Sequence, residues 1–242
     1  MKILITNDDG IENKGIRLLA QWAKKLGEVT VVAPKVEQSA KSHAIEFVKP
    51  IEIKKLAFLE GVTAYVMDST PADCVRFAVL GLKEKYDLVL SGINKGVNLG
   101  ADIVYSGTVG AVFEAARLGL KGIAFSAFPD GQEIAAGYLD EVYAYLQERN
   151  LLQETPIFNI NLPNEVKGIR MTYQGTPYFC DSFALMAGSE DMYEQIGAPV
   201  PDEYPDDIHR DTVATVRGYI SVTPLLTTRT DMRVFEKYKT QE

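Results

Sequence analysis

The sequence predicts an α/β protein built on a doubly wound, mostly parallel, Rossmann-like sheet. From the N-terminus to about residue 165, short apolar runs alternate with segments whose apolar residues recur at helical spacing. Apolar runs of this density are typical of strands buried on both faces. Repeated strand–helix units place such strands side by side in a parallel sheet that is covered by helices on both faces.

Each element follows from its local pattern. The first strand is expected at 3–5, and residues 15–26 carry apolar side chains at helical spacing before Gly27 ends the helix. A second strand at 29–33 stops at Pro34, and an excursion of antiparallel strands is expected over 45–55. The later elements, in chain order, are strand 63–67, helix 71–82 with a proline in its first turn, strand 87–90, helix 109–118, strand 123–125, helix 134–146 and strand 157–160.

The character of the chain changes beyond Pro163. Residues 1–165 are expected to form the α/β catalytic domain, and residues 166–242 a β-rich extension of the same structural unit. Strands are expected at 169–173 and 219–222 with no helix between them, and the acidic stretch 189–211 is expected to be a surface loop. Hairpins with exposed edges commonly pair with another subunit, so this extension is the predicted oligomer interface.

Composition narrows the class of function. The formal net charge of −8 excludes binding of duplex nucleic acid by bulk electrostatics, but a bound metal ion still allows a small phosphorylated substrate. No apolar run is long enough to span a membrane, and the short start before Asp8 does not resemble a signal peptide. The expected location is therefore cytoplasmic. The only cysteines, Cys74 and Cys180, lack ligand-like spacing, and Cys74 is expected to be a buried structural thiol.

Oxygen and amide side chains follow each predicted strand. Asp8 and Asp9 end the first strand, and Ser39 lies in the loop after the second. The carboxyl ends of parallel strands meet at one edge of the sheet, where ligands bind. Two adjacent carboxylates repel each other, which favours a divalent cation between them. The alternative is a solvated Asp-Gly turn.

Two further segments carry chemistry. Residues 91–100 are rich in glycine and asparagine, so that Asn94 or Asn98 could offer an oxygen to a hard cation, or could simply form a structural turn. Ser106 and Thr108 precede a helix, where they could cap it or help its amides to bind phosphate. The Gly-Lys-Ser/Thr of a P-loop and the Gly-x-Ser-x-Gly of a serine hydrolase are absent.

The chain has two histidines, His43 and His209. A site made mainly of histidine is therefore excluded, which disfavours Zn²⁺ and favours Mg²⁺, Mn²⁺ or Ca²⁺ on oxygen ligands. His43 lies in the loop of Ser39, where it could assist the site or form a structural hydrogen bond. No catalytic role is expected for His209.

Together the motifs resemble the SurE survival-protein family over nearly the whole chain. The blocks that carry the resemblance are NDDG at 7–10, AP at 33–34 with QS at 38–39, TPADCV at 70–75, SGIN at 91–94, YSGTVGA at 105–111 and SVTPL at 221–225. The chain departs from the family pattern at Ala40, where glycine is common, and at Lys35-Val36, where an acidic–basic pair is more typical.

The resemblance implies a 5′-nucleotidase that uses one divalent metal ion, Mg²⁺ or Mn²⁺, to hydrolyse nucleoside 5′- and 3′-monophosphates. It also implies a homodimer or homotetramer whose subunits exchange C-terminal segments. The implied metal ligands are Asp8, Asp9, Ser39 and Asn94. The residues implied around the phosphate are Asn98, Ser106, Gly107 and Thr108.

The chemistry of the residues agrees with this activity. A hard cation on Asp8 and Asp9 would polarise a phosphoryl oxygen and activate water, and the segment 106–108 would stabilise the developing charge. An aspartyl-phosphate route lacks its usual Asp-x-Asp spacing. Two other functions stay open: a metal-dependent deacetylase, whose histidine ligands are missing here, and a nucleotide or phosphate sensor without turnover.

Overall fold

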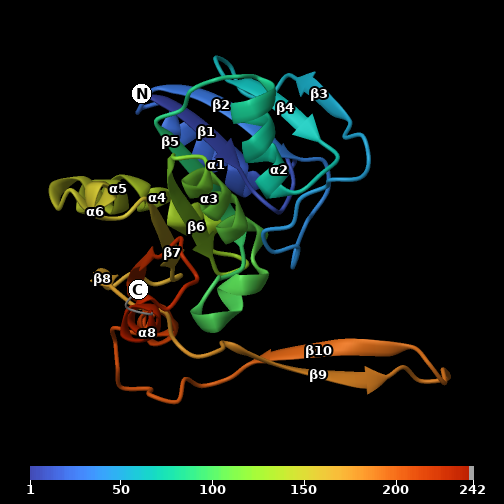
Figure 1. The fold of residues 1–242 in the computed structure, drawn as a ribbon, viewed down its shortest axis with the longest axis vertical. Helices are drawn as coiled ribbons and strands as arrows, with labels where there is room; N and C mark the ends of the chain where they lie inside the picture. Colours follow the sequence, from blue (N-terminus) through green and yellow to red (C-terminus); the bar gives the residue numbers. More distant parts are fainter. Residues whose placement is uncertain (240–242) are drawn as a thin grey trace.

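The computed structural model of the chain describes residues 1–239, and its centre is a nine-stranded sheet in the order β3-β4-β2-β1-β5-β6-β7-β11-β8 (Figure 1). The inner strands β4, β2, β1, β5, β6 and β7 run parallel. This arrangement confirms the predicted doubly wound sheet. The inner strands are β1 Lys2–Thr6, β2 Glu28–Pro34, β4 Thr63–Met67, β5 Leu88–Lys95, β6 Lys121–Ala127 and β7 Ile157–Leu162.

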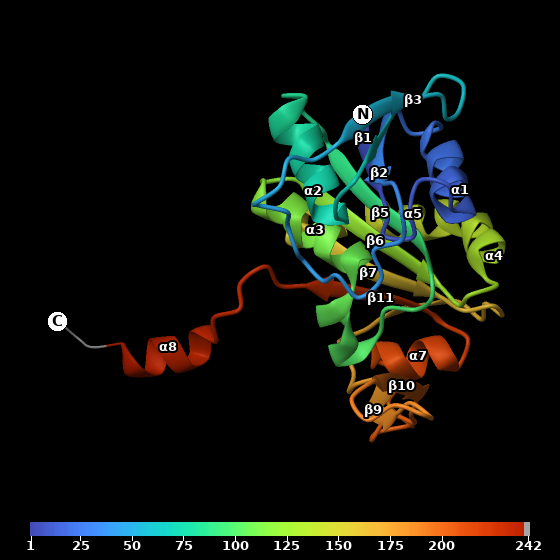
Figure 2. The same ribbon diagram turned by 90° about the vertical axis from the view of Figure 1, so that its right-hand side faces the viewer.

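Helices cover both faces of this sheet (Figure 2). Alternate residues of β1 point to opposite faces, so Ile3 and Ile5 join one apolar core and Leu4 joins the other. Helices α2 and α3 pack on the face of Leu4, whereas α1, α4 and α5 pack on the opposite face. The helices of the α/β body are α1 Lys14–Ala23, α2 Pro71–Arg76, α3 Gly107–Arg117, α4 Gln132–Gly137, α5 Leu139–Glu148 and α6 Leu151–Glu154.

Two predicted helices are interrupted. The helix expected over 71–82 is α2 followed by the π-helical turn η1, Phe77–Gly81. The helix expected over 134–146 is divided between α4 and α5 at Tyr138, directly after Gly137, because glycine is a poor residue for a helix interior. The excursion expected over 45–55 contains one strand, β3 Ile53–Leu56, which pairs antiparallel with β4 at the edge of the sheet.

The C-terminal part completes the main sheet and then leaves it. Strand β11, Ile220–Leu225, pairs antiparallel with β7, and β8, Ile169–Met171, pairs parallel with β11. The expectation of no helix between these strands is wrong, because α7, Asp211–Val216, lies there with most of its residues buried. Its six residues and its Thr- and Val-rich composition gave no helical pattern in the sequence.

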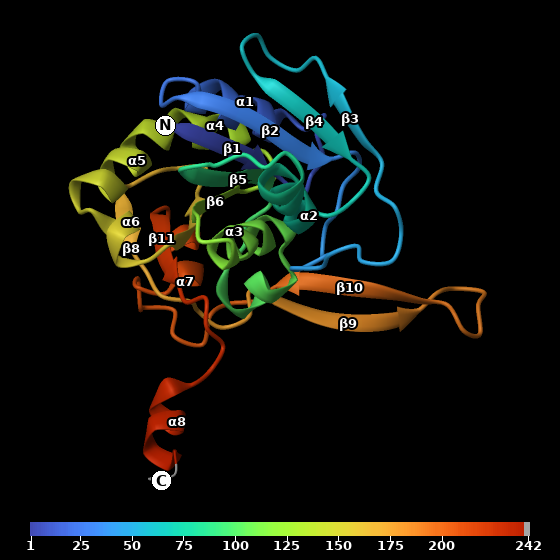
Figure 3. The ribbon, with the colours of Figure 1, turned by 45° about the horizontal axis from the view of Figure 1, so that its top comes forward.

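A long hairpin projects from the body (Figure 3). Its strands are β9, Phe179–Leu185, and β10, Tyr193–Pro199, which pair antiparallel and are almost entirely exposed. The stretch 189–211 is therefore not a surface loop throughout, since it contains β10. Helix α8, Met232–Tyr238, stands away from the body and has no buried residue (Figure 2). Among residues 1–239, no helix combines the length and apolar character that crossing a membrane requires.

Candidate active site

A cavity of about 400 Å³ lies where the loops after β1, β2 and β5 meet the start of α3 and the root of the hairpin. It brings together residues that are far apart in the sequence. Asp9, Gly107 and Thr108 are not in its wall but contact residues that are. The cavity is lined by Asp8, Ser39, Ala40, Asn94, Lys95, Gly96, Val97, Asn98, Asp102, Tyr105, Ser106, Phe179 and Asp181.

Asp8 is held by the first turn of α3. It is 5% exposed, and its Oδ1 accepts a hydrogen bond from Oγ1 of Thr108, while its Oδ2 accepts one from the backbone N–H of Thr108 at 3.0 Å. A Cβ on Gly107 would lie 3.0 Å from Cβ of Asp8, so glycine permits this close approach. Burial raises the pKa of Asp8, and the two bonds from Thr108 oppose that rise.

Asp9 is tied to the end of β5. Its Oδ2 accepts a hydrogen bond from the backbone N–H of Lys95 at 2.9 Å. Burial raises the pKa of Asp9 to about 6, and the neighbouring charge of Asp8 adds to that rise. Both carboxylates are therefore held in surroundings that disfavour their charged forms. A cation between them would reverse this effect on each.

The loop of Ser39 is fastened to the segment η2, Gly100–Tyr105. Oγ of Ser39 donates to Oε1 of Glu37 at 2.6 Å, and the backbone N–H of Ser42 donates to the carbonyl oxygen of Tyr105 at 2.9 Å. Ala40 has a φ of 58°, in the left-handed region that favours glycine. Ala40 thus replaces the glycine that is common in the family at a position whose backbone conformation suits glycine better.

Asn94 lies near the end of β5, just after the register of β5 on β6 shifts between Ser91 and Asn94. Such an irregularity re-aims side chains at the end of a strand. Nδ2 of Asn94 donates to the carbonyl oxygen of Gly96 at 2.8 Å. Among residues 1–239, no donor is hydrogen-bonded to Oδ1 of Asn94, so this oxygen is available to a cation.

Asn98 is clamped by two asparagines of β7 that the sequence reasoning missed. The carbonyl oxygen of Asn98 accepts hydrogen bonds from Nδ2 of Asn159 and Nδ2 of Asn161, both at 2.8 Å. The backbone N–H of Asn98 donates to Oδ1 of Asn161 at 2.7 Å. The sequence did carry a signal, because two amide side chains two positions apart in a buried strand lie on the same face and need polar partners.

Two backbone N–H groups at the start of α3 already donate to protein side chains. Oγ of Ser106 accepts the backbone N–H of Val109 at 3.1 Å, which is the capping role considered for Ser106. The N–H of Thr108 is used by Asp8. Of the predicted phosphate residues, Asn98 and Ser106 line the cavity, while Thr108 is fully buried behind Asp8.

The donors at this site are oxygens of mixed type. No three His, Cys, Asp or Glu side chains within residues 1–239 are grouped closely enough to hold a metal ion by themselves. A cation here would need the hydroxyl of Ser39 and the amide oxygen of Asn94 beside the carboxylates of Asp8 and Asp9. Such a set of hard oxygen donors suits Mg²⁺ or Mn²⁺ and does not suit a structural zinc site. The buried Oδ1 of Asn7 also lacks a protein partner within the described chain.

His43 forms the structural hydrogen bond that was one of its two predicted roles. Its Nε2 lies 2.8 Å from Oε2 of Glu114, a carboxylate that also pairs with Arg76 and Arg117. Although burial opposes it, bonding to His43 and the two arginines lowers the pKa of Glu114 to about 2. Nδ1 of His209 lies 3.4 Å from the carbonyl oxygen of Met171, outside the cavity.

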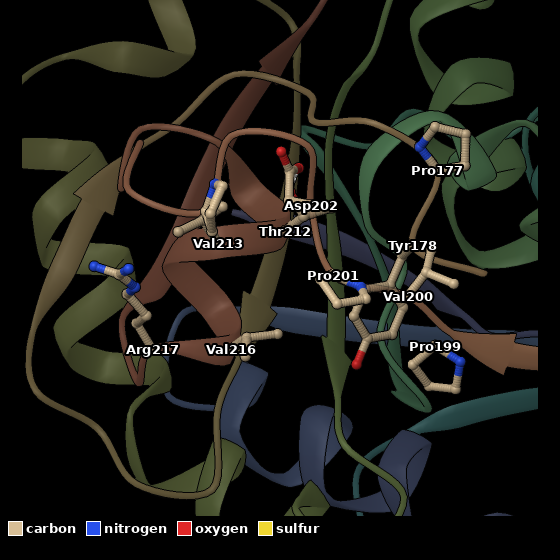
Figure 4. Close-up of a pocket in the computed structure, with 11 residues that line it drawn as sticks. Pro177, Tyr178, Pro199, Val200, Pro201, Asp202, Thr212, Val213, Val216 and Arg217 are labelled. Atoms are coloured by element: carbon tan, nitrogen blue, oxygen red, sulfur yellow. Dashed lines mark hydrogen bonds between the residues drawn. The ribbon is translucent and has the colours of Figure 1, made fainter. Parts of the chain in front are cut away.

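A second cavity, of about 380 Å³, lies between the root of the hairpin and α7 (Figure 4). Its wall is largely apolar and contains Pro177, Pro199 and Pro201. It includes none of the residues predicted for catalysis or metal binding. The predicted site residues that line a cavity therefore line the first one.

Comparisons with known proteins agree with this geometry. Residues 3–181 match the family described as Survival protein SurE. A 5′-nucleotidase SurE of Thermoanaerobacter sp. (strain X514) is 38% identical over 233 residues, covering 93% of this chain and 92% of that protein. Another, from Legionella pneumophila subsp. pneumophila, is 36% identical over 249 residues, covering 98% and 95%. The crystal structure of the SurE protein of Aquifex aeolicus has a TM-score of 0.82 at 35% identity, covering 99% of this chain and 98% of that one.

Proposed function

This chain belongs to the SurE survival-protein family. We propose that it hydrolyses nucleoside 5′- and 3′-monophosphates to nucleoside and phosphate, and that the reaction takes place in the first cavity with one divalent metal ion. The nucleotidase assignment rests on relatives named 5′-nucleotidase SurE that are similar over nearly the full chain. The metal and the 3′ activity are our own extensions of that assignment.

One observation supports the proposal most directly. The paired carboxylates of Asp8 and Asp9 are half-buried or buried, and burial raises the pKa of both. The two hydrogen bonds from Thr108 nevertheless hold Asp8 in one fixed orientation beside the cavity. If Asp8 and Asp9 served structural ion pairs, cationic side chains would lie beside both carboxylates. Among the described residues, Lys95 is the only cationic side chain in the cavity wall.

Asp8, Asp9, Ser39 and Asn94 would hold the metal ion, which when bound supplies Lewis-acid polarisation of a phosphoryl oxygen and lowers the pKa of water. The protein's own groups orient the metal ligands and fix the backbone beside them. Thr108 orients Asp8, the Lys95 amide orients Asp9, and the clamp from β7 fixes the backbone of Asn98. The start of α3 follows Ser106 in the cavity wall, and its positive end would favour a phosphoryl group bound beside Asp8.

We further propose that the working form is a homodimer or homotetramer. The hairpin exposes Phe183 and Ile196, at 70% and 47%, and α8 exposes Val234 and Phe235, at 53% and 51%. Apolar side chains on projecting elements of this kind are typical of segments that another subunit covers. Sedimentation velocity over a concentration series tests this; a monomer at all concentrations would contradict it.

The test of the activity is a panel of 5′- and 3′-nucleotides and simple phosphomonoesters, assayed with Mg²⁺, with Mn²⁺ and with chelator. We expect turnover only with metal, and its loss in Asp9→Asn. Asp130→Asn, an exposed aspartate on a loop outside the cavity, is the matched control and should keep full activity. Turnover in chelator, or a fully active Asp9→Asn, would contradict the proposal; metal-dependent binding without turnover would favour the sensor.

A further inference from the structure

Two exposed aromatic side chains share the catalytic cavity with the metal and phosphate residues. Tyr105 is 59% exposed and Phe179 is 40% exposed, and both line the cavity. Resting on the proposed function, we propose that Tyr105 and Phe179 bind the nucleobase by stacking and so determine which phosphomonoesters the enzyme prefers. Aromatic faces are the usual partners of unpaired bases, because every base presents a π-face.

Phe179 reaches the cavity from the root of the hairpin. It begins β9, and Asp181, two residues later on the same face of the strand, also lines the cavity. The backbone N–H groups of Tyr178 and Phe179 donate to Oδ2 of Asp102 at 2.7 and 2.8 Å. Asp102 lies in η2, which also forms cavity wall, so the position of Phe179 is fixed relative to the catalytic loop.

The ring of Tyr178 reinforces this position. It meets the ring of Phe179 edge to face, with centroids 5.0 Å apart and an interplanar angle of 81°. That geometry is a favourable aromatic pair and leaves a face of Phe179 available for a further ring. Phe179 therefore combines a fixed backbone, a supported ring and an exposed face.

Tyr105 comes from the other side of the site. It ends η2 and directly precedes Ser106, the residue that caps α3. Its carbonyl oxygen accepts the N–H of Ser42, so its backbone is tied to the loop of Ser39. Tyr105 therefore lines the same cavity as its neighbour Ser106, one of the residues proposed for the phosphate.

The charges of the cavity favour a single phosphate with an uncharged aromatic group. The wall carries the carboxylates of Asp8, Asp102 and Asp181 against one cationic side chain, Lys95. Away from the metal, a second phosphate would meet net negative charge, whereas a base is neutral. A volume of about 400 Å³ also lies within the usual range for small-molecule sites.

The experiment compares adenosine 5′-monophosphate with ribose 5-phosphate, which has the same phosphate and sugar but no base. We expect Phe179→Ala and Tyr105→Ala each to lower the ratio of kcat/KM for the nucleotide to kcat/KM for the sugar phosphate by about tenfold, through KM, as expected for the loss of base stacking. Phe179→Tyr and Tyr105→Phe should restore the ratio. Phe47→Ala, which removes an exposed ring outside the cavity and outside the hairpin, is the matched control.

Inhibition by the products gives a second readout. Adenosine should inhibit the alanine variants about tenfold more weakly than wild type, whereas inorganic phosphate should inhibit all of them alike. Equal losses for nucleotide and sugar phosphate would overturn the inference, because they indicate a merely structural role. An unchanged ratio, or a wild type that does not distinguish the two substrates, would overturn it too. If wild type hydrolyses neither substrate with metal, the proposed function itself fails.

Discussion

Replacing Thr108 with valine should weaken metal binding without disturbing the helix that carries it. Both hydrogen bonds from Thr108 go to Asp8, one from the hydroxyl and one from the backbone. Valine has a similar shape, so it removes the hydroxyl donor and leaves the backbone donor in place. Thr108 is fully buried, so the position of the lost hydroxyl is not exposed to the solvent.

The size of the effect follows from the kind of bond. A hydrogen bond to a charged group contributes about 1.5–3 kcal/mol, which corresponds to about 10–150-fold in an equilibrium constant. Burial raises the pKa of Asp8 and the hydroxyl of Thr108 lowers it, so Thr108→Val should raise that pKa further. A metal ion binds the ionised carboxylate, so the metal affinity of Thr108→Val should fall at least about tenfold where protons compete for Asp8, and it should recover as the pH rises.

Isothermal titration calorimetry with Mn²⁺ at several pH values between about 5.5 and 8.5 measures this directly. Thr108→Ser keeps a hydroxyl and should remain close to wild type. The pH profile of kcat/KM should shift upward in Thr108→Val in parallel with the affinity. Equal Mn²⁺ affinity in wild type, Thr108→Val and Thr108→Ser at every pH would refute the role assigned to Asp8 and its donor.

Three other substitutions test the surroundings of the site. Asn161→Ala leaves the part-buried backbone N–H of Asn98 without its partner and removes one of the two donors to the Asn98 carbonyl oxygen. It should cost about 1–3 kcal/mol and lower the Tm by about 2–12 °C, and an unchanged Tm would contradict the clamp. Ala40→Gly relieves the strain of an alanine in the left-handed backbone region, so it should raise the free energy of unfolding, measured in urea, by about 0.5–1 kcal/mol. A less stable variant would argue against that strain. Burial raises the pKa of Asp211 from 3.8 to about 6, so its contribution to stability is present at low pH and is lost as the pH rises through about 6. Asp211→Asn should therefore flatten the fall of Tm between about pH 4 and 7, and an identical slope would count against this titration.

The sequence was informative where burial imposes a pattern. The strands β1, β2, β4, β5, β6 and β7 are buried on both faces, and their apolar runs predicted them at nearly the right places. The hairpin β9–β10 was missed because almost all of it is exposed, so neither face has to be apolar. Helix α7 was missed because it is too short to show a period.

The site likewise contains residues that a local pattern predicts and contacts that it does not. Asp8, Ser39, Asn94 and Asn98 follow predicted strands whose ends meet at one edge of the sheet, and Ser106 precedes a predicted helix. All five residues line one cavity. The supporting contacts could not be predicted in the same way. Asp102 binds backbone amides 76 and 77 residues further along the chain, and such partners depend on the path of a loop that no local pattern specifies.

The hairpin joins two regions that would otherwise be independent. At its root β9 places Phe179 in the cavity wall, and farther out the same strand exposes Phe183 to the solvent. Any protein that holds the outer part of β9 thereby acts on the strand that carries Phe179. If such a partner changes the affinity for a ligand at Phe179, thermodynamic reciprocity requires the ligand to change the affinity for the partner by the same factor. In a self-associating enzyme, the apparent substrate affinity would then depend on protein concentration.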